Sequence, residues 1–124
     1  MKVLLVDDSR TIRNIQKNVL AQMGSIEVVE AADGVEALAR VKGDQPDLIL
    51  LDRNMPNMDG LTFLAKLRGA GNKTPVIMCT TEAEKSRVIE AIKAGATNYI
   101  VKPFTVESLA TKINETIAKV GIGR

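Results

Sequence analysis

The stretch LILLDRNMPNMDGL, residues 48–61, is the part of the chain that most constrains the fold. Four apolar residues, 48–51, run directly into Asp52, and a loop rich in turn-forming residues, including Pro56 and Gly60, follows. A continuous apolar run is typical of a strand that is covered on both faces, as in a parallel sheet. The stretch therefore predicts a carboxylate at the end of a buried strand, where it either opens a turn or belongs to a functional site.

Short apolar runs alternate with segments of helical period along the whole chain. The other runs are residues 3–6, 26–29 (broken by a glutamate), 76–79 and 99–101. The helical stripes between them are formed by Ile12, Ile15, Val19 and Met23; Val35, Leu38 and Val41; Leu61, Leu64, Ala65 and Leu67; Val88, Ile89 and Ile92; and Val106, Leu109, Ile113, Ile117 and Val120. Five strand–helix pairs in succession predict an α/β fold in which a five-stranded parallel sheet has helices on both faces.

Residues suited to helix ends support this order of elements. Asp33, with Glu36 three residues later, fits a capping box, and Thr105 is suited to cap the last helix. Glycine stands where four of the helices are expected to stop, at positions 24, 43, 69 and 95.

Length and composition are those of one globular domain. With 124 residues, no internal linker and no low-complexity segment, we expect residues 1–124 to form a single domain without an attached output domain. The basic residues are scattered and aromatic residues make up only 2%, which argues against a nucleic-acid interface. The apolar runs are too short for a membrane span or a signal peptide, so we expect a cytoplasmic protein.

Rare residue types also limit the chemistry. The chain has no histidine, which excludes a histidine-activated serine or cysteine nucleophile, a histidine zinc site and a phosphohistidine carried on this chain. The single cysteine, Cys79, cannot form an internal disulfide, and its place in an apolar run predicts a small buried thiol.

Polar residues directly follow four of the five predicted strands. In an open parallel sheet, ligands bind beyond the carboxyl ends of the strands, so these residues are expected at one edge. They are Asp7 and Asp8, Asp52, Thr80 and Thr81, and Lys102. Each has an ordinary alternative role, since the aspartates and threonines can cap helices or form turns and the lysine can be solvated. Because one topological argument brings all of them together, we interpret them as one site.

The chemistry of this set favours a magnesium ion and a phosphoryl group. Carboxylates within a few ångströms repel one another, at a cost on the order of a few kcal/mol per pair, and Lys102 or a dication would offset this repulsion. Carboxylate oxygens with room for water suit Mg²⁺, whereas zinc is disfavoured without histidine or paired cysteines. A metal and a lysine neutralise phosphoryl oxygens, and a carboxylate can be the nucleophile. We expect Asp52 to be this nucleophile, Asp7 and Asp8 to anchor the metal, and Thr80 to donate to a phosphoryl oxygen.

The same residues carry a resemblance to a known family. The acidic pair at 7–8, LLDRNMPNMDG around Asp52, CTTE at 79–82 and KPF at 102–104 together resemble a receiver domain of the two-component response regulators, over essentially the whole chain. The stretches DDSRTIRNIQKNVLAQMG and TTEAEKSRVIEAIKAGATNYIVKPFT are further similar to the stand-alone, CheY-type receivers of chemotaxis. The resemblance implies a doubly wound, flavodoxin-like sheet with strand order 2-1-3-4-5 and a cis bond between Lys102 and Pro103.

The resemblance also implies a metal site and an activity. Mg²⁺ would be bound by Asp8, Asp52 and the backbone carbonyl of Asn54, with Asp7 contributing through water. Asp52 would take a phosphoryl group from a phosphohistidine on a partner histidine kinase. The chain would then be a monomeric signalling switch rather than an enzyme, with self-catalysed phosphotransfer and slow autodephosphorylation as its only catalysis.

Further positions acquire roles from the same resemblance. Thr80 and Lys102 would bind the phosphoryl group, and Tyr99 would turn inward into space that Thr80 vacates. The face that binds the flagellar motor switch protein would include Lys85, Val88, Tyr99 and Lys112. The alternative is that Tyr99 simply packs against its own strand and that the lysines lie on a solvated helix face.

Two positions depart from the chemotaxis pattern. Arg53 follows Asp52 where many of these receivers carry an aromatic residue, and its guanidinium either reaches neighbouring acids or points into solvent. Thr81 follows Thr80 in place of a smaller alanine, which we expect to narrow access to the phosphoryl group and alter the rate of dephosphorylation.

Three other functions compete with a motor-binding switch. A phosphorelay shuttle would pass the phosphoryl group on to another regulator. A Mg²⁺-dependent aspartyl phosphatase would need a second acid two residues after the nucleophile, where this chain has Asn54. A flavin- or nucleotide-binding module would need a phosphate-binding loop after the first strand, where Asp7 and Asp8 would repel a phosphate.

Overall fold

Strands and helices alternate along the chain in the computed structural model, which describes residues 1–81 and 88–121. The elements are β1 (Lys2–Val6), α1 (Arg10–Ala21), β2 (Glu27–Ala31), α2 (Gly34–Asp44), β3 (Leu48–Asp52), α3 (Gly60–Gly69), β4 (Val76–Thr81), α4 (Val88–Lys93), β5 (Asn98–Lys102) and α5 (Val106–Val120). No helix in the described ranges combines the length and the apolar character that a membrane crossing requires.

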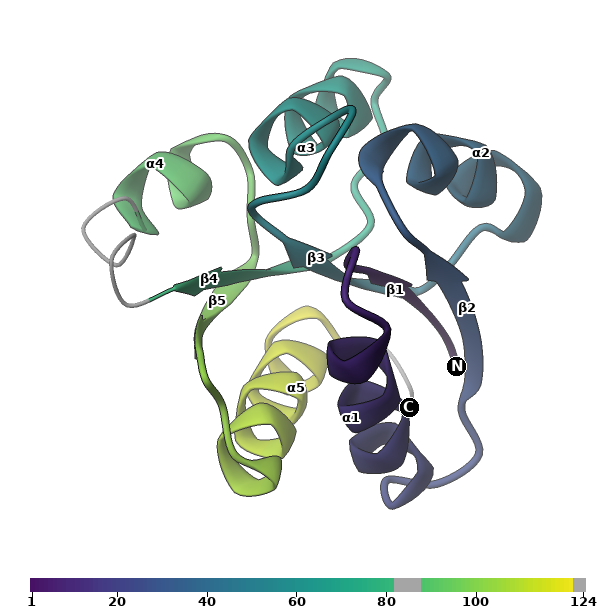
Figure 1. Ribbon diagram of the computed structural model, residues 1–124, viewed down its shortest axis with the longest axis vertical. Coiled ribbons are helices and arrows are strands. Elements are labelled where there is room, and N and C mark those ends of the chain that lie inside the picture. Colours follow the sequence, from purple (N-terminus) through teal and green to yellow (C-terminus); the bar gives the residue numbers. More distant parts are fainter. Residues whose placement is uncertain (82–87, 122–124) are drawn as a thin grey trace.

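The strands form one parallel sheet in the order β2-β1-β3-β4-β5. Helices α2, α3 and α4 cover one face of this sheet, and α1 and α5 cover the other (Figure 1). The doubly wound, flavodoxin-like fold and the strand order 2-1-3-4-5 are therefore confirmed. Since all strands are parallel, their carboxyl ends share one edge, and the central strands β1 and β3 end side by side on it.

The apolar residues of the two central strands have no exposed surface. Residues 3–6 and 48–51 are fully buried, as a strand covered by helices on both faces requires. Alternate side chains of these strands enter different apolar clusters: Leu4, Val6, Ile49 and Leu51 pack toward α2, α3 and α4, and Val3, Leu5, Leu48 and Leu50 pack toward α1 and α5. Apolar packing on both faces of the sheet thus fixes the ends of β1 and β3, where the polar residues stand.

Side chains cap the starts of α1, α2 and α5, and the caps of α2 and α5 are the predicted ones. The Ser9 hydroxyl accepts a hydrogen bond from the Ile12 N–H at the start of α1, and Thr105 forms a complete capping box at the start of α5. Asp33 accepts from the Glu36 N–H at 2.8 Å, as predicted. The carboxylate of Glu36, however, accepts from the Ala32 N–H at 3.5 Å and does not close the predicted box.

Two predicted helix boundaries are wrong. Gly43 lies inside α2, which continues to Asp44 because the Gln45 N–H still bonds to a helical carbonyl, and Gln45 itself takes the left-handed cap conformation at φ 46°. Gly24 lies beyond the end of α1, which closes at Gln22. The other two glycines fit, since α3 ends at Gly69 and Gly95 stands two residues after Lys93, the last residue of α4.

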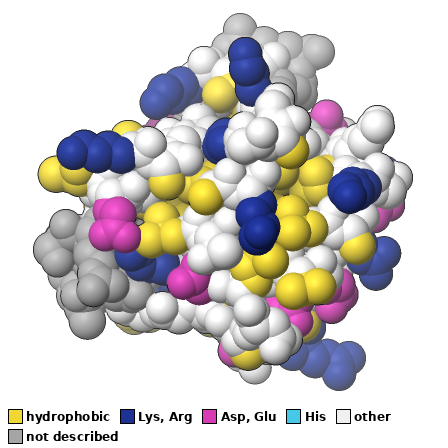
Figure 2. Space-filling model, turned by 90° about the horizontal axis from the view of Figure 1, so that it is seen from above, with side chains coloured by type: hydrophobic (Ala, Val, Ile, Leu, Met, Phe, Trp, Pro, Cys, Tyr) yellow, Lys and Arg dark blue, Asp and Glu magenta, His cyan; other side chains and the backbone are white. Residues whose placement is uncertain are grey.

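The apolar stripe predicted for α4 does not face the core. Ile89 and Ile92 are 67% and 45% exposed, and the small residue Ala91 is the one that is fully buried. Figure 2 views the molecule from the side of α2, α3 and α4 and shows hydrophobic side chains reaching the surface between charged ones. Apolar side chains on α4 are therefore available to solvent or to a partner.

Candidate functional site

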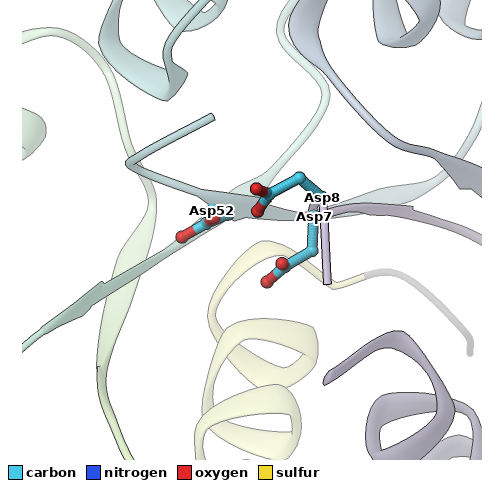
Figure 3. A group of neighbouring side chains, drawn as sticks. All are labelled: Asp7, Asp8 and Asp52. Atoms are coloured by element: carbon cyan, nitrogen blue, oxygen red, sulfur yellow. The ribbon is translucent and has the colours of Figure 1, made fainter. Parts of the chain in front are cut away.

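Three carboxylates meet at the edge where β1 and β3 end (Figure 3). Asp7 and Asp8 directly follow β1, and Asp52 is the last residue of β3. One carboxylate oxygen of each lies within 4.8 Å of the others. Asp7 and Asp52 are buried and Asp8 is exposed, so the cluster is open to solvent on one side. Hard oxygen ligands with an open side, where water can complete the coordination, fit Mg²⁺.

Lys102 brings a positive charge into this cluster. Its Nζ donates to Oδ2 of Asp7 at 2.8 Å and to Oδ1 of Asp52 at 3.1 Å. Lys102 is the last residue of β5, and β4 lies between β5 and β3, so the side chain reaches past the end of β4. The Lys102–Pro103 peptide bond is cis, as predicted. We refer to Asp7, Asp8, Asp52 and Lys102 as the acidic site.

The charges of the acidic site are not balanced. The pKa of Asp52 is raised to about 6, because burial disfavours the carboxylate and the charge of Asp7 adds to this effect, while Lys102 opposes both. Burial lowers the pKa of Lys102, but the hydrogen bond to Asp7 and the two negative charges outweigh it, so its pKa is raised overall. The ammonium therefore stays charged, and the site as a whole retains net negative charge that a cation would relieve.

Glycine 60 allows the loop after Asp52 to return against the strand end. Its N–H donates to the carbonyl of Arg53 at 2.9 Å, and a Cβ at this position would collide with the carbonyl oxygen of Asp52. The next element starts at once, because Asp59 caps α3 by accepting from the Thr62 N–H at 2.8 Å. The sequence MDG therefore fixes the geometry of the segment that carries Asp52.

The same loop is fastened to α2 on its other side. Asn57 takes a left-handed conformation at φ 68°, and its amide donates to Oδ2 of Asp33 at 2.7 Å. Gly34, the first residue of α2, leaves room for Met58, since a Cβ there would lie 2.9 Å from the Met58 side chain. Asn54 is exposed, and its backbone N–H bonds to the Asp52 carboxylate.

Comparison with known proteins agrees with this geometry. The response regulator receiver domain family matches residues 3–114. The chain belongs to the response regulator receiver family. The receiver is 47% identical to the chemotaxis protein CheY1 of Helicobacter pylori over 116 residues, which cover 91% of this chain and 94% of that protein.

Two further relatives are equally well covered. The receiver is 45% identical over 120 residues to a chemotaxis protein CheY homologue of Campylobacter jejuni, with 94% of this chain and 92% of that protein aligned. The crystallised chemotaxis response regulator CheY4 of Vibrio cholerae superposes with a TM-score of 0.85 at 40% identity, covering 93% of this chain and 97% of that one. This protein is therefore a CheY-like receiver of the two-component type.

The receiver places Thr80 next to the acidic site on a neighbouring strand. Thr80 lies one residue beyond Cys79, which pairs with Asp52 in the β3–β4 ladder, and it is buried. Its hydroxyl donates to the backbone carbonyl of Thr81 at 3.1 Å. Cys79 is the buried thiol predicted from the sequence, and burial raises its pKa to about 12.

The predicted switch and partner residues that the structure describes lie on β5, α5 and α4. Tyr99 is half-buried on β5, and the ammonium of Lys112 lies 4.6 Å from the centre of its ring. Val88 is the partly exposed first residue of α4. Lys85 lies outside the described residues. The structure thus brings Tyr99 and Lys112 into contact, away from the acidic site itself.

Sequence analysis missed a cationic side chain beside the carboxylates. Arg13 of α1 donates to the backbone carbonyl of Asp7 and, at 2.9 Å, to Oε1 of Glu30 on β2. Lys17 contacts the other oxygen of Glu30 at 3.2 Å. The available signal was spacing, because Arg13 stands one helical turn after the capping residue Ser9 and so faces the end of β1.

Arg53 resolves one of the alternatives left open by the sequence. Its side chain is 5% exposed, and its Nη2 donates to Oε1 of Glu90 on α4 at 3.1 Å. The guanidinium therefore reaches a neighbouring acid rather than solvent.

The raised pKa of Asp52 predicts that this residue contributes a gain in the stability of the metal-free protein as the pH falls from about 7.5 to about 4.5. In that range the folded state binds more protons than the unfolded state, so acidification removes a penalty of about 2 kcal/mol, after allowance for solvent screening. The lowered pKa values of Asp33, Asp59 and Glu30 act in the opposite direction. Urea unfolding in EDTA should therefore be compared between parent and Asp52→Asn, and an unchanged difference across this range would contradict the assignment.

Proposed function

We propose that this receiver is a phospho-accepting switch in which Asp52 takes a phosphoryl group from a phosphohistidine on a partner histidine kinase. The phosphorylated form then changes its affinity for a protein target, the flagellar motor switch protein of chemotaxis. The observation that supports this most strongly is the convergence of Asp52 with Asp7, Asp8 and Lys102 at one edge of the sheet. The chemotaxis relatives support the choice of target. We also propose that the protein acts as a monomer in the cytoplasm.

Each side chain of the acidic site has a separate role in phosphoryl transfer. A carboxylate oxygen of Asp52 attacks phosphorus, the phosphorus–nitrogen bond of the phosphohistidine breaks, and the imidazole leaves with its electron pair and takes a proton from water. Lys102 already donates to Oδ1 of Asp52, which orients the nucleophile and places a positive charge beside the incoming group. Mg²⁺, held by Asp7, Asp8, Asp52 and the carbonyl of Asn54, would supply charge neutralisation at the phosphoryl oxygens.

The added phosphoryl group changes the hydrogen bonding around Thr80. It brings about −1.5 to −2 charges and new acceptor oxygens to the end of β3. The Thr80 hydroxyl, which donates to Thr81 in this structure, would turn to the phosphoryl group, and Tyr99 would move into the space released. Because Tyr99 contacts Lys112 on α5, its movement would alter the proposed partner face of Lys85, Val88, Tyr99 and Lys112.

A pull-down with a phosphoryl mimic tests this function. Immobilised receiver is incubated with a motor switch peptide, with and without Mg²⁺ and beryllofluoride, and with a histidine phosphotransfer protein as the competing partner. We expect beryllofluoride to increase capture of the switch peptide at least about tenfold, a coupling of about 1.4 kcal/mol, and Asp52→Asn to remove the increase. Capture of the phosphotransfer protein alone would favour a phosphorelay shuttle and contradict the motor target.

Magnesium binding is tested by thermal unfolding. At a Mg²⁺ concentration of about 100 times its Kd, binding to the folded state contributes roughly 2.7 kcal/mol, or a rise in Tm of several degrees. We expect Asp8→Ala to reduce this rise to less than about half, because one of the three carboxylates is lost. Asp44→Asn, at the far end of α2, should keep the full rise. Equal shifts for Asp8→Ala and the parent would remove Asp8 from the metal site.

A further inference from the structure

Arg53 joins the segment that carries the phosphoacceptor to helix α4. Its backbone is fixed at both ends, because its N–H donates to the carbonyl of Cys79 at 3.0 Å and its carbonyl accepts from Gly60 at 2.9 Å. The side chain leaves this fixed point in a buried position and ends on Glu90 at 3.1 Å. A movement of the backbone at Asp52 would therefore also move the guanidinium of Arg53, which contacts α4 through Glu90.

The α4 end of this ion pair lies on a helix whose described residues bury little apolar surface. In α4, Ala91 is the fully buried residue, whereas Ile89 and Ile92 are 67% and 45% exposed. Glu90 is itself about half-exposed, with a side-chain exposure of 56%. A small alanine provides little buried area, so the charge-assisted hydrogen bond from the buried Arg53 helps to fix the helix, as do the two hydrogen bonds from Arg68 to the Gly95 carbonyl just after it.

From this geometry we propose that Arg53 is a positioning residue that holds α4 in its unphosphorylated place through Glu90, and that phosphorylation of Asp52 weakens this contact through the backbone that the two residues share. The inference rests on the proposed function and extends it to the path by which the acidic site acts on α4. Arg53 is the next residue after Asp52, so a change of backbone conformation at Asp52 on phosphorylation moves the guanidinium that bonds to Glu90. Release of Glu90 then allows α4 to shift. This shift changes the positions of the exposed side chains of Ile89 and Ile92 on the surface that a partner would contact.

The inference is tested by the chemical shifts of the backbone amides of α4, measured by ¹⁵N NMR. In the parent, Mg²⁺ with beryllofluoride should shift the amide signals near Asp52 and those of Ile89 and Ile92. Glu90→Gln keeps the shape of the side chain and removes its charge. Without the mimic, we expect this variant to move the α4 signals at least about one third of the way to the activated positions, while the Mg²⁺-dependent shifts near Asp52 stay within about twofold of the parent.

A double-mutant cycle separates the ion pair from unrelated effects. If the two side chains act through each other, Arg53→Gln, Glu90→Gln and the double variant should displace the α4 signals by the same amount. The matched control is Glu107→Gln, an exposed carboxylate on α5, which should leave them in place. If the α4 signals of Glu90→Gln stay in place, as in Glu107→Gln, the inference is contradicted. It is also contradicted if the double variant displaces the signals by the sum of the two single displacements. Neither result would contradict the proposed function. A parent that shows no response to beryllofluoride anywhere would overturn the proposed function as well.

Discussion

Asp52→Asn is expected to lower labelling by acetyl phosphate, a small phosphodonor, by at least about 100-fold, because the amide lacks the anionic oxygen that attacks phosphorus. The same substitution should stabilise the metal-free protein by about 2 kcal/mol near pH 7.5. It removes a buried negative charge that faces Asp7, and the amide oxygen can still accept from Lys102. Phosphate-affinity gel electrophoresis measures the first effect, and urea unfolding in EDTA measures the second.

A gain in stability would show that the charge of Asp52 destabilises the metal-free fold, which is not expected of a carboxylate with a purely structural role. Asp44→Asn is the matched control, since Asp44 lies at the end of α2 and its carboxylate is 3.9 Å from Nη1 of Arg40. It should change neither labelling nor the free energy of unfolding by more than about 0.5 kcal/mol. If Asp52→Asn labels as fast as the parent, Asp52 is not the nucleophile. If it unfolds more easily without metal, charge repulsion does not dominate the acidic site.

Lys102→Met is expected to have the largest effect on stability, a loss of about 2–4 kcal/mol in metal-free buffer at pH 8. It leaves the buried carboxylates of Asp7 and Asp52 facing each other without the ammonium that bonds to both. The loss should shrink near pH 5, because Asp52, with a pKa of about 6, can then neutralise the repulsion by binding a proton.

The exposed lysine Lys73 provides the control for this charge removal. Lys73→Met should change the free energy of unfolding by less than about 0.5 kcal/mol at either pH. Mg²⁺ should restore part of the stability lost in Lys102→Met, since it supplies positive charge to the same carboxylates. A Lys102→Met protein that is as stable as the Lys73→Met control at pH 8 would show that the carboxylates do not depend on the lysine.

The central part of the fold could be predicted because burial on both faces leaves a plain pattern. Residues 3–6 and 48–51 read as continuous apolar runs and are the fully buried centres of β1 and β3. The acidic site followed from topology, since parallel strands deliver whatever follows them to one edge. The ends of the strands were less accurate: β3 includes Asp52 and β5 includes Lys102, because ladder hydrogen bonds continue through residues whose side chains are polar.

The parts that could not be predicted depend on packing between elements distant in sequence. Ile89 and Ile92 fit a helical stripe, but apolar character alone does not distinguish a core face from an exposed one, and the small Ala91 packs inward. Arg53 stood beside Asp52 with two open interpretations, and only the position of α4 shows that it reaches Glu90. Arg13 likewise contacts Asp7 from a neighbouring helix, and its spacing from Ser9 is the one sequence signal that marks it.

Chemical trapping of the labelled residue is the most direct test of Asp52 as the phosphoacceptor beside a magnesium ion. The protein is treated with acetyl phosphate in Mg²⁺ or in EDTA, reduced with borohydride, which converts an acyl phosphate to an alcohol, and mapped by peptide mass spectrometry. We expect homoserine at position 52 in Mg²⁺ and at least about tenfold less in EDTA. Homoserine at Asp7, Asp8 or Asp59 instead, or equal conversion with and without Mg²⁺, would contradict the assignment.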